Sequence, residues 1–251
     1  MAAENRKKET FPRIKPCGDR ALTVIVGDRI DPKVNDKVYA LYTAIKAAPM
    51  DGLLDMVPSF ASLLICFDPD KTSFFLLKDR LLDLEKQLSL KPSPKKALIW
   101  NVPCCYSRRF SPDLESVADH AGMSAEEVVA RHSGGLYRIY MLGFLPGFVY
   151  LGGLDPAIAC PRLKTPRKKI PRGAVGIGGS QTGIYPLDSP GGWRLIGSTP
   201  VPMYDPCRAD PVLCRPGDFI RFVPITTCQY YDISRDVTNR SFKAETEEYR
   251  E

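Results

Sequence analysis

Two short apolar runs, each followed by apolar residues at helical spacing, make up the first part of the chain. ALTVIV at residues 21–26 and SLLICF at residues 62–67 are typical of buried strands. The first precedes Asp31-Pro32, an N-cap with a proline at the first helical position, which predicts a helix over residues 34–48. The second precedes FFLLKDRLLDLEKQL, which has helical spacing up to Leu88. Residues 11–90 are therefore predicted to form a small α/β sandwich domain.

A second set of elements begins with the strand-like run ALIWNVPCCYS. It is followed by PDLESVADHAG and SAEEVVARHSG, each of which predicts a short helix. Ser124 and Glu127 have the spacing of a capping box, and Gly122 and Gly134 are expected to end the two helices. These features predict a pair of helices that follows one strand.

After Tyr137 the pattern changes to short β-rich runs separated by glycine and proline. This alternation favours a closed or nearly closed β-barrel, so residues 97–240 are predicted to be a second domain and the fold class is α+β. The polar, proline-rich residues 90–96 are expected to be the linker. Both polar ends, residues 1–10 and 241–251, are expected to fray.

Composition narrows the function without deciding it. The 35 basic residues are interleaved with 29 acidic ones, so the formal net charge of +6 is weak evidence for a nucleic-acid partner. No segment has the roughly 20 consecutive apolar residues that a membrane helix needs. The eight cysteines form no C-x-x-C pair and only two histidines are present, so we expect reduced cysteines, no metal site and a cytoplasmic protein.

The segment GFLPGFVYLGGL, residues 143–154, combines glycine and proline with aromatic residues. Its glycines permit backbone conformations that other residues resist, so a tight loop carrying Phe144, Phe148 and Tyr150 is one interpretation. The alternative is a glycine-rich barrel corner with packed aromatic side chains.

The segment PRLKTPRKKIPRG, residues 161–173, is basic and stiffened by three prolines. A stiff basic segment can bind a carboxylate, a phosphate or an acyl phosphate at little ordering cost. A solvated basic loop is the alternative. The cations of this segment are Arg162, Lys164, Arg167, Lys168, Lys169 and Arg172.

The segment GIGGSQTGIYPLDSPGGW, residues 176–193, mixes glycines with neutral hydrogen-bonding side chains. Glycines 178, 179 and 183 could let backbone N–H groups approach a ligand, while Gln181, Thr182 and Tyr185 suit an amide or an oxyanion. No lysine follows the glycines as in a phosphate-binding P-loop, so we assign no ATP site here. A barrel turn remains the alternative.

Few residues in the chain are obvious acid–base catalysts. His132 could act as a general base, but a histidine at a helix C-terminus is also stabilised by the helix dipole. His120 is expected to be structural, and Ser180 has no nearby histidine and acid that would complete a triad. Asp188 and Asp205 are conceivable acids or bases, although turn chemistry also explains an aspartate next to proline.

The order of these motifs resembles the KipI family, which includes the B subunit of 5-oxoprolinase. It is also similar to part of the carboxyltransferase domain of urea carboxylases, known as allophanate hydrolase subunit 1. The motifs are G-F-x-P-G-F-x-Y-L-G, T-P-R, V-G-I-x-G-x-Q-T-G-I-Y-P, S-P-G-G-W-x-x-I-G and R-P-G-D-F-I-R-F-V-P-I, together with G-D-R-A-L at residues 18–22.

The resemblance implies a fold, an activity and partners. The fold would be an N-terminal α/β domain followed by a cyclophilin-like β-barrel. The activity would be that of one component of an ATP-dependent enzyme that opens 5-oxoproline to glutamate. The partners would be a KipA-like C subunit and a LamB/YcsF-like A subunit, with ATP bound in the assembled complex. We assign catalytic roles to His132, Gln181 and Tyr185, and substrate binding to Phe148, Arg162, Arg167, Thr182 and Trp193.

Two departures and two alternatives accompany this assignment. Ser198 stands where the family is expected to have arginine, and Arg172 where it is expected to have a small residue, so the positive charge in the cleft is expected to lie differently. A KipI-like inhibitor of a sensor histidine kinase is one alternative function. A component of urea carboxylase or allophanate hydrolase is the other, and it would need biotin carried by another chain.

Overall fold

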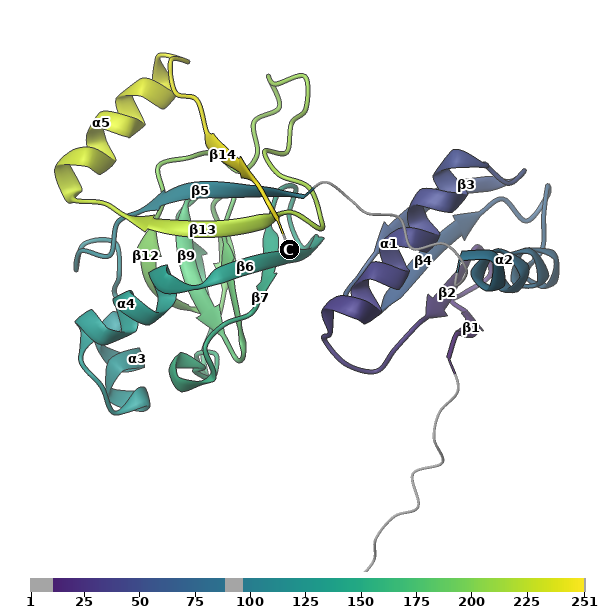
Figure 1. Cartoon of the computed structure of the whole chain (residues 1–251), viewed down its shortest axis with the longest axis horizontal. Coiled ribbons are helices and arrows are strands. Elements are labelled where there is room, and N and C mark those ends of the chain that lie inside the picture. Colours follow the sequence, from purple (N-terminus) through teal and green to yellow (C-terminus); the bar gives the residue numbers. More distant parts are fainter. Residues whose placement is uncertain (1–10, 89–96, 251) are drawn as a thin grey trace, which may run out of the picture. The chain divides into compact units, whose positions relative to one another are not determined.

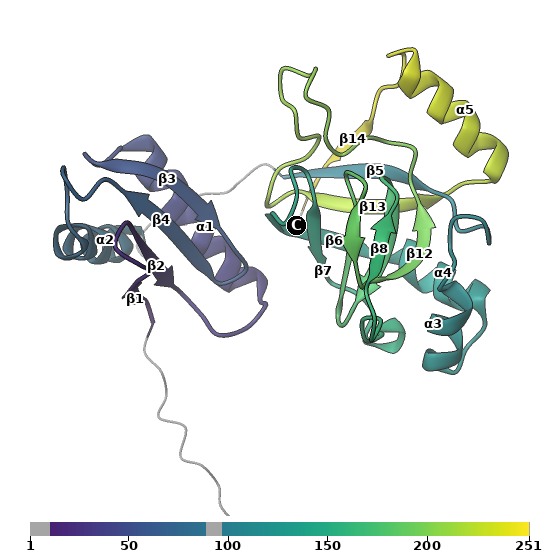
Figure 2. The same ribbon diagram turned by 180° about the vertical axis from the view of Figure 1, so that it is seen from behind.

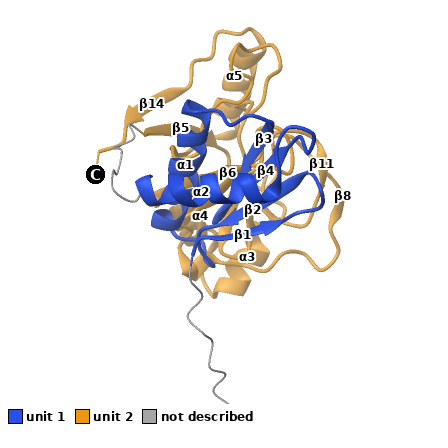
Figure 3. Cartoon of the chain, turned by 90° about the vertical axis from the view of Figure 1, so that its right-hand side faces the viewer, with its two compact units in different colours: residues 1–95 blue, residues 96–251 orange. Residues whose placement is uncertain are grey.

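The computed structural model describes residues 11–88 and 97–250. The chain divides into two compact units, residues 1–95 and residues 96–251 (Figure 3). The expected linker, residues 90–96, and the expected frayed N-terminus, residues 1–10, lie outside the described residues.

Unit 1 is a four-stranded antiparallel sheet with two helices (Figure 1). Both expected strands and both expected helices are present, and two further strands pair at the sheet edges in the order β1-β2-β4-β3. The elements are β1 (Arg13–Pro16), β2 (Ala21–Ile25), α1 (Pro32–Ala47), β3 (Leu53–Pro58), β4 (Ser62–Phe67) and α2 (Phe74–Leu88).

Local chemistry explains where α1 begins and which residues form the core of unit 1. The Asp31 carboxylate accepts a hydrogen bond from the Lys33 N–H at 2.8 Å, and Pro32 follows as the first helical residue. Alternate residues of β2 and β4 are buried, and Leu22, Leu63 and Ile65 have no exposed surface. These strands and the inner faces of both helices therefore share one hydrophobic core.

Unit 2 is built on a curled eight-stranded sheet in the order β12-β9-β10-β7-β6-β13-β5-β14. Neighbouring strands are antiparallel except β13 and β5, which are parallel. The strands are β5 (Leu98–Cys104), β6 (Leu136–Leu142), β7 (Val149–Gly152), β9 (Ala174–Gly178), β10 (Gln181–Ile184), β12 (Arg194–Ser198), β13 (Phe219–Pro224) and β14 (Glu245–Glu248). A separate two-stranded ribbon consists of β8 (Arg167–Ile170) and β11 (Ser189–Gly191).

The curled sheet comes close to closure but the described strands do not form a closed barrel. Its first strand, β12, meets the chain just after β5 through one pair of residues, Cys105 and Ser198. Their two backbone hydrogen bonds measure 2.8 and 3.0 Å, and no longer ladder joins these strands. Figures 1 and 2 show the strands wrapping around the core of unit 2. The fold is mixed α+β, with a nearly closed sheet where a barrel was predicted.

The helices of unit 2 are α3 (Leu114–Ala121), α4 (Ala125–Gly134) and α5 (Thr227–Thr238), with a short 3₁₀ turn, η1 (Pro156–Ile158). The predicted capping box of α4 is confirmed: the Glu127 N–H donates to the Ser124 hydroxyl, and the Ser124 N–H donates to the Glu127 carboxylate at 2.8 Å. The predicted helix end at Gly122 is also confirmed by its φ of 66°.

The C-terminal segment is more ordered than its composition suggests. Residues 241–251 were expected to fray, but β14 within this segment pairs with β5 over four residues. The Asn101 side-chain amide and the Arg221 guanidinium both donate to the Glu247 carboxylate, at 2.7 and 2.9 Å. The strand has no apolar alternation because all four of its residues are exposed, so hydrophobic pattern could not predict it.

Candidate functional site

Strand β10 divides the predicted site residues between two faces of the sheet. Side chains alternate along a strand, so Thr182 and Ile184 face the core while Gln181, Gly183 and Tyr185 face the opposite side. Of the eight predicted site residues, the structure brings six to the outer side of the sheet. The remaining two, Thr182 and His132, are completely buried on the inner side.

His132 is the centre of a buried hydrogen-bond chain. Its Nε2 lies 2.9 Å from the Thr182 hydroxyl, and that hydroxyl donates its single proton to the Gly176 carbonyl at 3.0 Å. Nε2 must therefore carry a proton, and Nδ1 accepts from the Tyr106 hydroxyl at 2.8 Å. The chain connects α4 and the segment after β5 to β9 and β10.

The surroundings of His132 keep its ring neutral and both ring nitrogens hydrogen-bonded. The ring stacks on Phe222, with 4.6 Å between centroids, and burial lowers the pKa of His132 to about 3. Both ring nitrogens already have partners, so in this conformation neither is free to take a proton from a substrate. These contacts support a structural role for His132, although not through the helix dipole, which would stabilise the protonated ring.

The outer side of the sheet carries a second hydrophobic cluster, which we call the outer layer. Its buried members are Phe148, Ile170, Ala174, Tyr185, Trp193 and Leu195, with Leu145 and Tyr150 packed against them. The Phe148 ring contacts Tyr185 and Trp193 edge-on, at centroid distances of 5.0 and 5.5 Å. The β8–β11 ribbon contributes Ile170 to this cluster. Three predicted site residues from distant parts of the sequence therefore touch one another.

The glycines of residues 176–193 make room for Trp193 rather than for a ligand. A Cβ atom on Gly178 would lie 2.5 Å from the indole, and one on Gly183 would lie 3.0 Å from it. We expected their backbone N–H groups, and that of Gly179, to approach a ligand. Instead Gly178 and Gly183 lie in the sheet ladder, and the Gly179 N–H donates to the Cys160 carbonyl at 2.9 Å.

Two arginines from the basic segment approach the outer layer. Arg162 lies over the Trp193 ring, 5.6 Å from its centroid. Arg167 donates through Nη2 to Asp113 at 2.7 Å, and the other oxygen of this carboxylate accepts from the Leu195 N–H at 2.7 Å. Asp113, which sequence reasoning missed, therefore holds Arg167 at the outer layer. Its position before α3 gave no signal of this, because its partners lie 54 and 82 residues away.

The Tyr185 hydroxyl lies at the meeting point of these groups. A Cβ atom on Gly191 would lie 2.6 Å from the Tyr185 Oη atom, and Gly191 pairs with Arg167 across the ribbon. Burial raises the pKa of Tyr185, while the backbone N–H of Trp193 and the guanidinium groups of Arg162 and Arg167 partly oppose this effect. At neutral pH the hydroxyl keeps its proton and can act as a hydrogen-bond donor.

Unpartnered polar atoms also gather in this region. Arg167 Nη1, Gln181 Nε2 and Ser189 Oγ are buried and have no hydrogen-bond partner within the described part of the chain. Most buried polar groups in proteins are hydrogen-bonded, so such atoms need an explanation, which can be catalysis or binding. The outer layer thus combines a buried aromatic cluster, two guanidinium groups and uncommitted N–H donors, and these are the chemical groups that recognise a small carboxylate or amide ligand.

The two residues that depart from the family pattern lie elsewhere on unit 2. The Ser198 hydroxyl lies 3.3 Å from the Tyr230 hydroxyl, between β12 and α5. The Arg172 N–H donates to the Asp188 carboxylate at 2.9 Å, and Lys169 forms an ion pair with the same carboxylate at 2.8 Å. Asp188, a conceivable acid or base, is therefore engaged with the basic segment.

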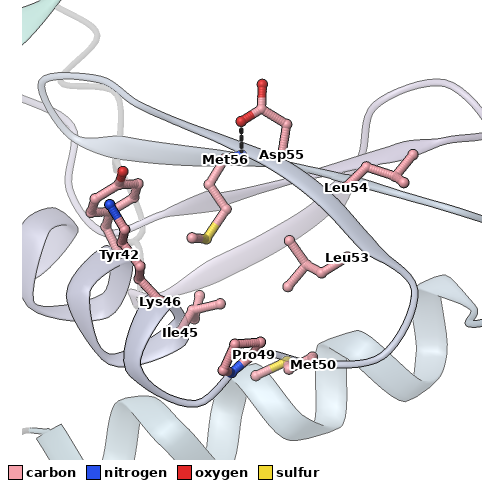
Figure 4. Close-up of a pocket in the computed structure, with 9 residues that line it drawn as sticks. All are labelled: Tyr42, Ile45, Lys46, Pro49, Met50, Leu53, Leu54, Asp55 and Met56. Carbon is pink, nitrogen blue, oxygen red and sulfur yellow. Dashed lines mark hydrogen bonds between the residues drawn. The ribbon is translucent and has the colours of Figure 1, made fainter. Parts of the chain in front are cut away.

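Two hollows lie away from the outer layer. One, of about 290 Å³, lies in unit 1 between the end of α1 and β3, and is lined by Tyr42, Ile45, Lys46, Pro49, Met50, Leu53, Leu54, Asp55 and Met56 (Figure 4). The Asp55 carboxylate accepts a hydrogen bond from the Met56 N–H rather than pointing into this hollow. The other, of about 400 Å³, lies beside α3 and α4 in unit 2. None of the predicted site residues lines either hollow.

Membrane-spanning helices and metal clusters are both absent from the described residues. No helix among residues 11–88 and 97–250 is long and apolar enough to cross a membrane. Within the same ranges, no group of three or more histidine, cysteine or acidic residues could hold a metal ion.

Comparison with known proteins identifies the family. Residues 12–214 match the carboxyltransferase domain, subdomain C and D. The chain belongs to this family. It is similar to the B subunit of 5-oxoprolinase from Bacillus subtilis, with 39% identity over 228 residues that cover 87% of this chain and 95% of the relative. A second similar protein is the B subunit of 5-oxoprolinase from Escherichia coli, with 38% identity over 72% of this chain and 82% of that protein.

Two solved structures are similar to this chain in fold. The structure of TTHA0988 is 40% identical, with a TM-score of 0.71, and the match covers 82% of this chain but only 40% of that one. The urea amidolyase of K. lactis has a TM-score of 0.79 at 24% identity, covering 94% of this chain and 16% of the larger protein. At 24% identity, the match to the urea amidolyase is evidence for the fold alone.

Proposed function

We propose that this chain is the B subunit of an ATP-dependent 5-oxoprolinase, which hydrolyses 5-oxoproline to glutamate together with the A and C subunits of that enzyme. The observation that carries the proposal is the 39% identity to the B subunit of a 5-oxoprolinase over 95% of that protein's length. Unit 2 would then be the cyclophilin-like barrel of the family, with its sheet nearly closed.

The outer layer is the proposed substrate site. 5-Oxoproline is a flat lactam ring that carries one carboxylate. Phe148 and Trp193 would pack against the ring, and Arg162 and Arg167 would bind the carboxylate. Gln181 and Tyr185 would donate to the lactam carbonyl, where negative charge develops as water attacks.

His132 and Thr182 have an indirect role in this proposal. Their hydrogen-bond chain fixes β10 from the inner side, and Gln181 and Tyr185 project from the outer side of the same strand. A positioning role explains why both residues are buried within the core. In this proposal neither His132 nor Thr182 contacts the substrate.

We place ATP in the assembled complex rather than on this chain alone. Phosphate-binding glycine loops usually lead into a helix N-terminus. Here the glycine-rich segment forms the β9–β10 hairpin instead. The A and C subunits would supply the groups that bind the nucleotide.

The test is ATP-dependent release of glutamate from 5-oxoproline, measured with this chain alone and with co-expressed A and C subunits. We expect activity only in the full mixture, and a loss of more than about tenfold for Gln181→Ala and for Arg167→Ala. Arg215→Ala is the matched control, because the Arg215 guanidinium pairs with the exposed Asp210 and lies outside the outer layer. Full activity of both outer-layer variants would contradict the proposed site.

A urea carboxylase-type component is the second candidate, because the fold matches the K. lactis urea amidolyase. Such a component would act on urea only with a biotin-carrying partner. Two results together would favour this candidate. The associated proteins would release no glutamate from 5-oxoproline, and activity on urea would depend on a biotinylated protein.

A further inference from the structure

Phe144 is an exposed aromatic residue in an unfavourable backbone conformation. Its side chain is 61% exposed and its φ is 66°, a region that residues other than glycine rarely adopt. Among the described residues only Arg240 shares a positive φ without being glycine. Nothing in the burial of Phe144 compensates this strain, which points to a function outside the isolated chain.

Backbone hydrogen bonds and one close contact hold the loop around Phe144. The Leu145 N–H donates to the Gly143 carbonyl at 2.8 Å, and the Phe148 N–H donates to the Leu145 carbonyl at 3.0 Å. Gly147 has a φ of 80° and lies so close to Met203 and Tyr204 that a Cβ atom there would clash. The loop therefore presents Phe144 to solvent in a fixed orientation, which lowers the entropy cost of binding through this side chain.

Phe144 is continuous with the outer layer. Its ring contacts Phe148 edge-on at 5.7 Å between centroids, and Phe148 in turn contacts Trp193. A macromolecule that covered Phe144 would thus lie directly beside the proposed substrate site.

The basic segment, residues 161–173, brings positive charge to the same aromatic cluster through Arg162. Of the six cations in residues 161–172, Arg167 pairs with Asp113 and Lys169 pairs with Asp188. The other four, Arg162, Lys164, Lys168 and Arg172, are exposed and form no ion pair within the described ranges. Arg162 connects this charge to the cluster because it lies over Trp193.

We propose that Phe144 anchors a docking surface for another protein of the complex, one that presents an apolar pocket rimmed by carboxylates. Aromatic and arginine side chains are the usual anchors of protein interfaces, and complementary charge steers association. The docked protein covers Phe144 and lies beside the outer layer, whose aromatic members are already buried within unit 2. The inference rests on the proposed function, since it assigns the surface through which a partner of this enzyme binds.

The experiment measures association of the full-length chain with the purified C subunit, and separately with the purified A subunit, by isothermal titration calorimetry. For Phe144→Asp we expect binding to one of them to weaken more than about tenfold. Phe75→Asp is the matched control, because Phe75 is 74% exposed on α2 of unit 1, and it should change affinity by less than about twofold. Lys164→Glu with Lys168→Glu should slow association and reduce its salt dependence.

Phe144→Gly separates a binding role from a structural one. Glycine adopts a positive φ without strain, so this variant should unfold at the same or a higher temperature than the unaltered chain while binding the partner more weakly. Loss of stability together with loss of binding would overturn the proposal.

Other outcomes are equally decisive. If the unaltered chain binds either partner and Phe144→Asp binds it equally well, the docking surface is wrong and the proposed enzyme function stands. If the unaltered chain neither binds a partner nor supports glutamate release, both proposals fail. A further test uses vesicles of phosphatidylserine and phosphatidylcholine. If the chain binds these vesicles through Phe144 and binds neither protein, Phe144 contacts a membrane and the proposal of a protein partner is wrong.

Discussion

At the scale of single residues, His132 makes folding sensitive to mild acid. Its ordinary pKa is 6.5 and burial lowers it to about 3 in the folded chain, so the unfolded chain binds the extra proton first. Stability from this residue is complete above pH 6.5 and declines as the pH falls toward 3. Each pH unit in this window costs about 1.4 kcal/mol. We therefore expect the free energy of unfolding to fall by about 2 kcal/mol between pH 7.5 and pH 5, as measured by urea denaturation.

The variant His132→Gln isolates this effect. Glutamine can still form hydrogen bonds but does not titrate, so the variant should be less stable at pH 7.5 and nearly independent of pH down to pH 5. Most carboxylates titrate below this window, which keeps their contribution small. An unchanged pH dependence in His132→Gln would show that another group is responsible.

The sequence could suggest which residues matter more easily than what each one does. Trp193 was predicted from the family resemblance, whereas Gln181 and Tyr185 were predicted because neutral hydrogen-bonding residues gather among glycines. All three lie on the same side of the sheet. Thr182 was chosen for the same reason as Gln181, but strand alternation turns it toward the core. Asp113 gave no sequence signal because its two partners are distant along the chain.

At the scale of elements, the β9–β10 hairpin is shaped by the indole that lies on it. In Gly178→Ala the new methyl group would meet the Trp193 ring at about 2.5 Å, so the ring or the strand must move. We expect a loss of about 1–3 kcal/mol in the free energy of unfolding, as is typical of overpacking, and a red shift of Trp193 fluorescence. The measurement is best made in a Trp100→Phe background, because Trp100 is the other tryptophan.

Gly134→Ala is the control for this substitution. Gly134 lies at the end of α4 and a Cβ atom there would meet nothing within 4 Å, so its replacement should be neutral or slightly stabilising. Equal effects of the two substitutions would contradict the packing explanation.

Elements with a strong hydrophobic period could be predicted, and elements held by other forces could not. α1, α2, β2 and β4 follow from buried positions at regular spacing. β14 has four exposed polar residues and depends on its ladder with β5. α5 was not predicted. It buries none of its residues, and the capping box of Thr226 and Gln229 marks where it begins.

At the scale of the whole molecule, each unit has a hydrophobic core of its own. The core of unit 1 includes Leu22, Leu63 and Ile65, and that of unit 2 includes Ile177 and Ile196, with no residue in common. The two-part division was predictable from the change between βα units and short β runs. The short β-rich runs also predicted a closed or nearly closed sheet. The residues that meet at its seam could not be predicted, because the one contact there joins Cys105 and Ser198, which lie 93 residues apart along the chain (198 − 105).

Separate cores predict separate unfolding transitions in differential scanning calorimetry. Leu63→Ala removes side-chain volume from the core of unit 1 and should cost about 2–5 kcal/mol, lowering one transition by roughly 10 °C or more. Ile177→Ala should lower the other transition by an amount that reflects the larger size of unit 2. In each variant the second transition should stay in place. A single transition that both substitutions lower together would mean that the units fold as one cooperative body, and that their cores, although separate in composition, are coupled in energy.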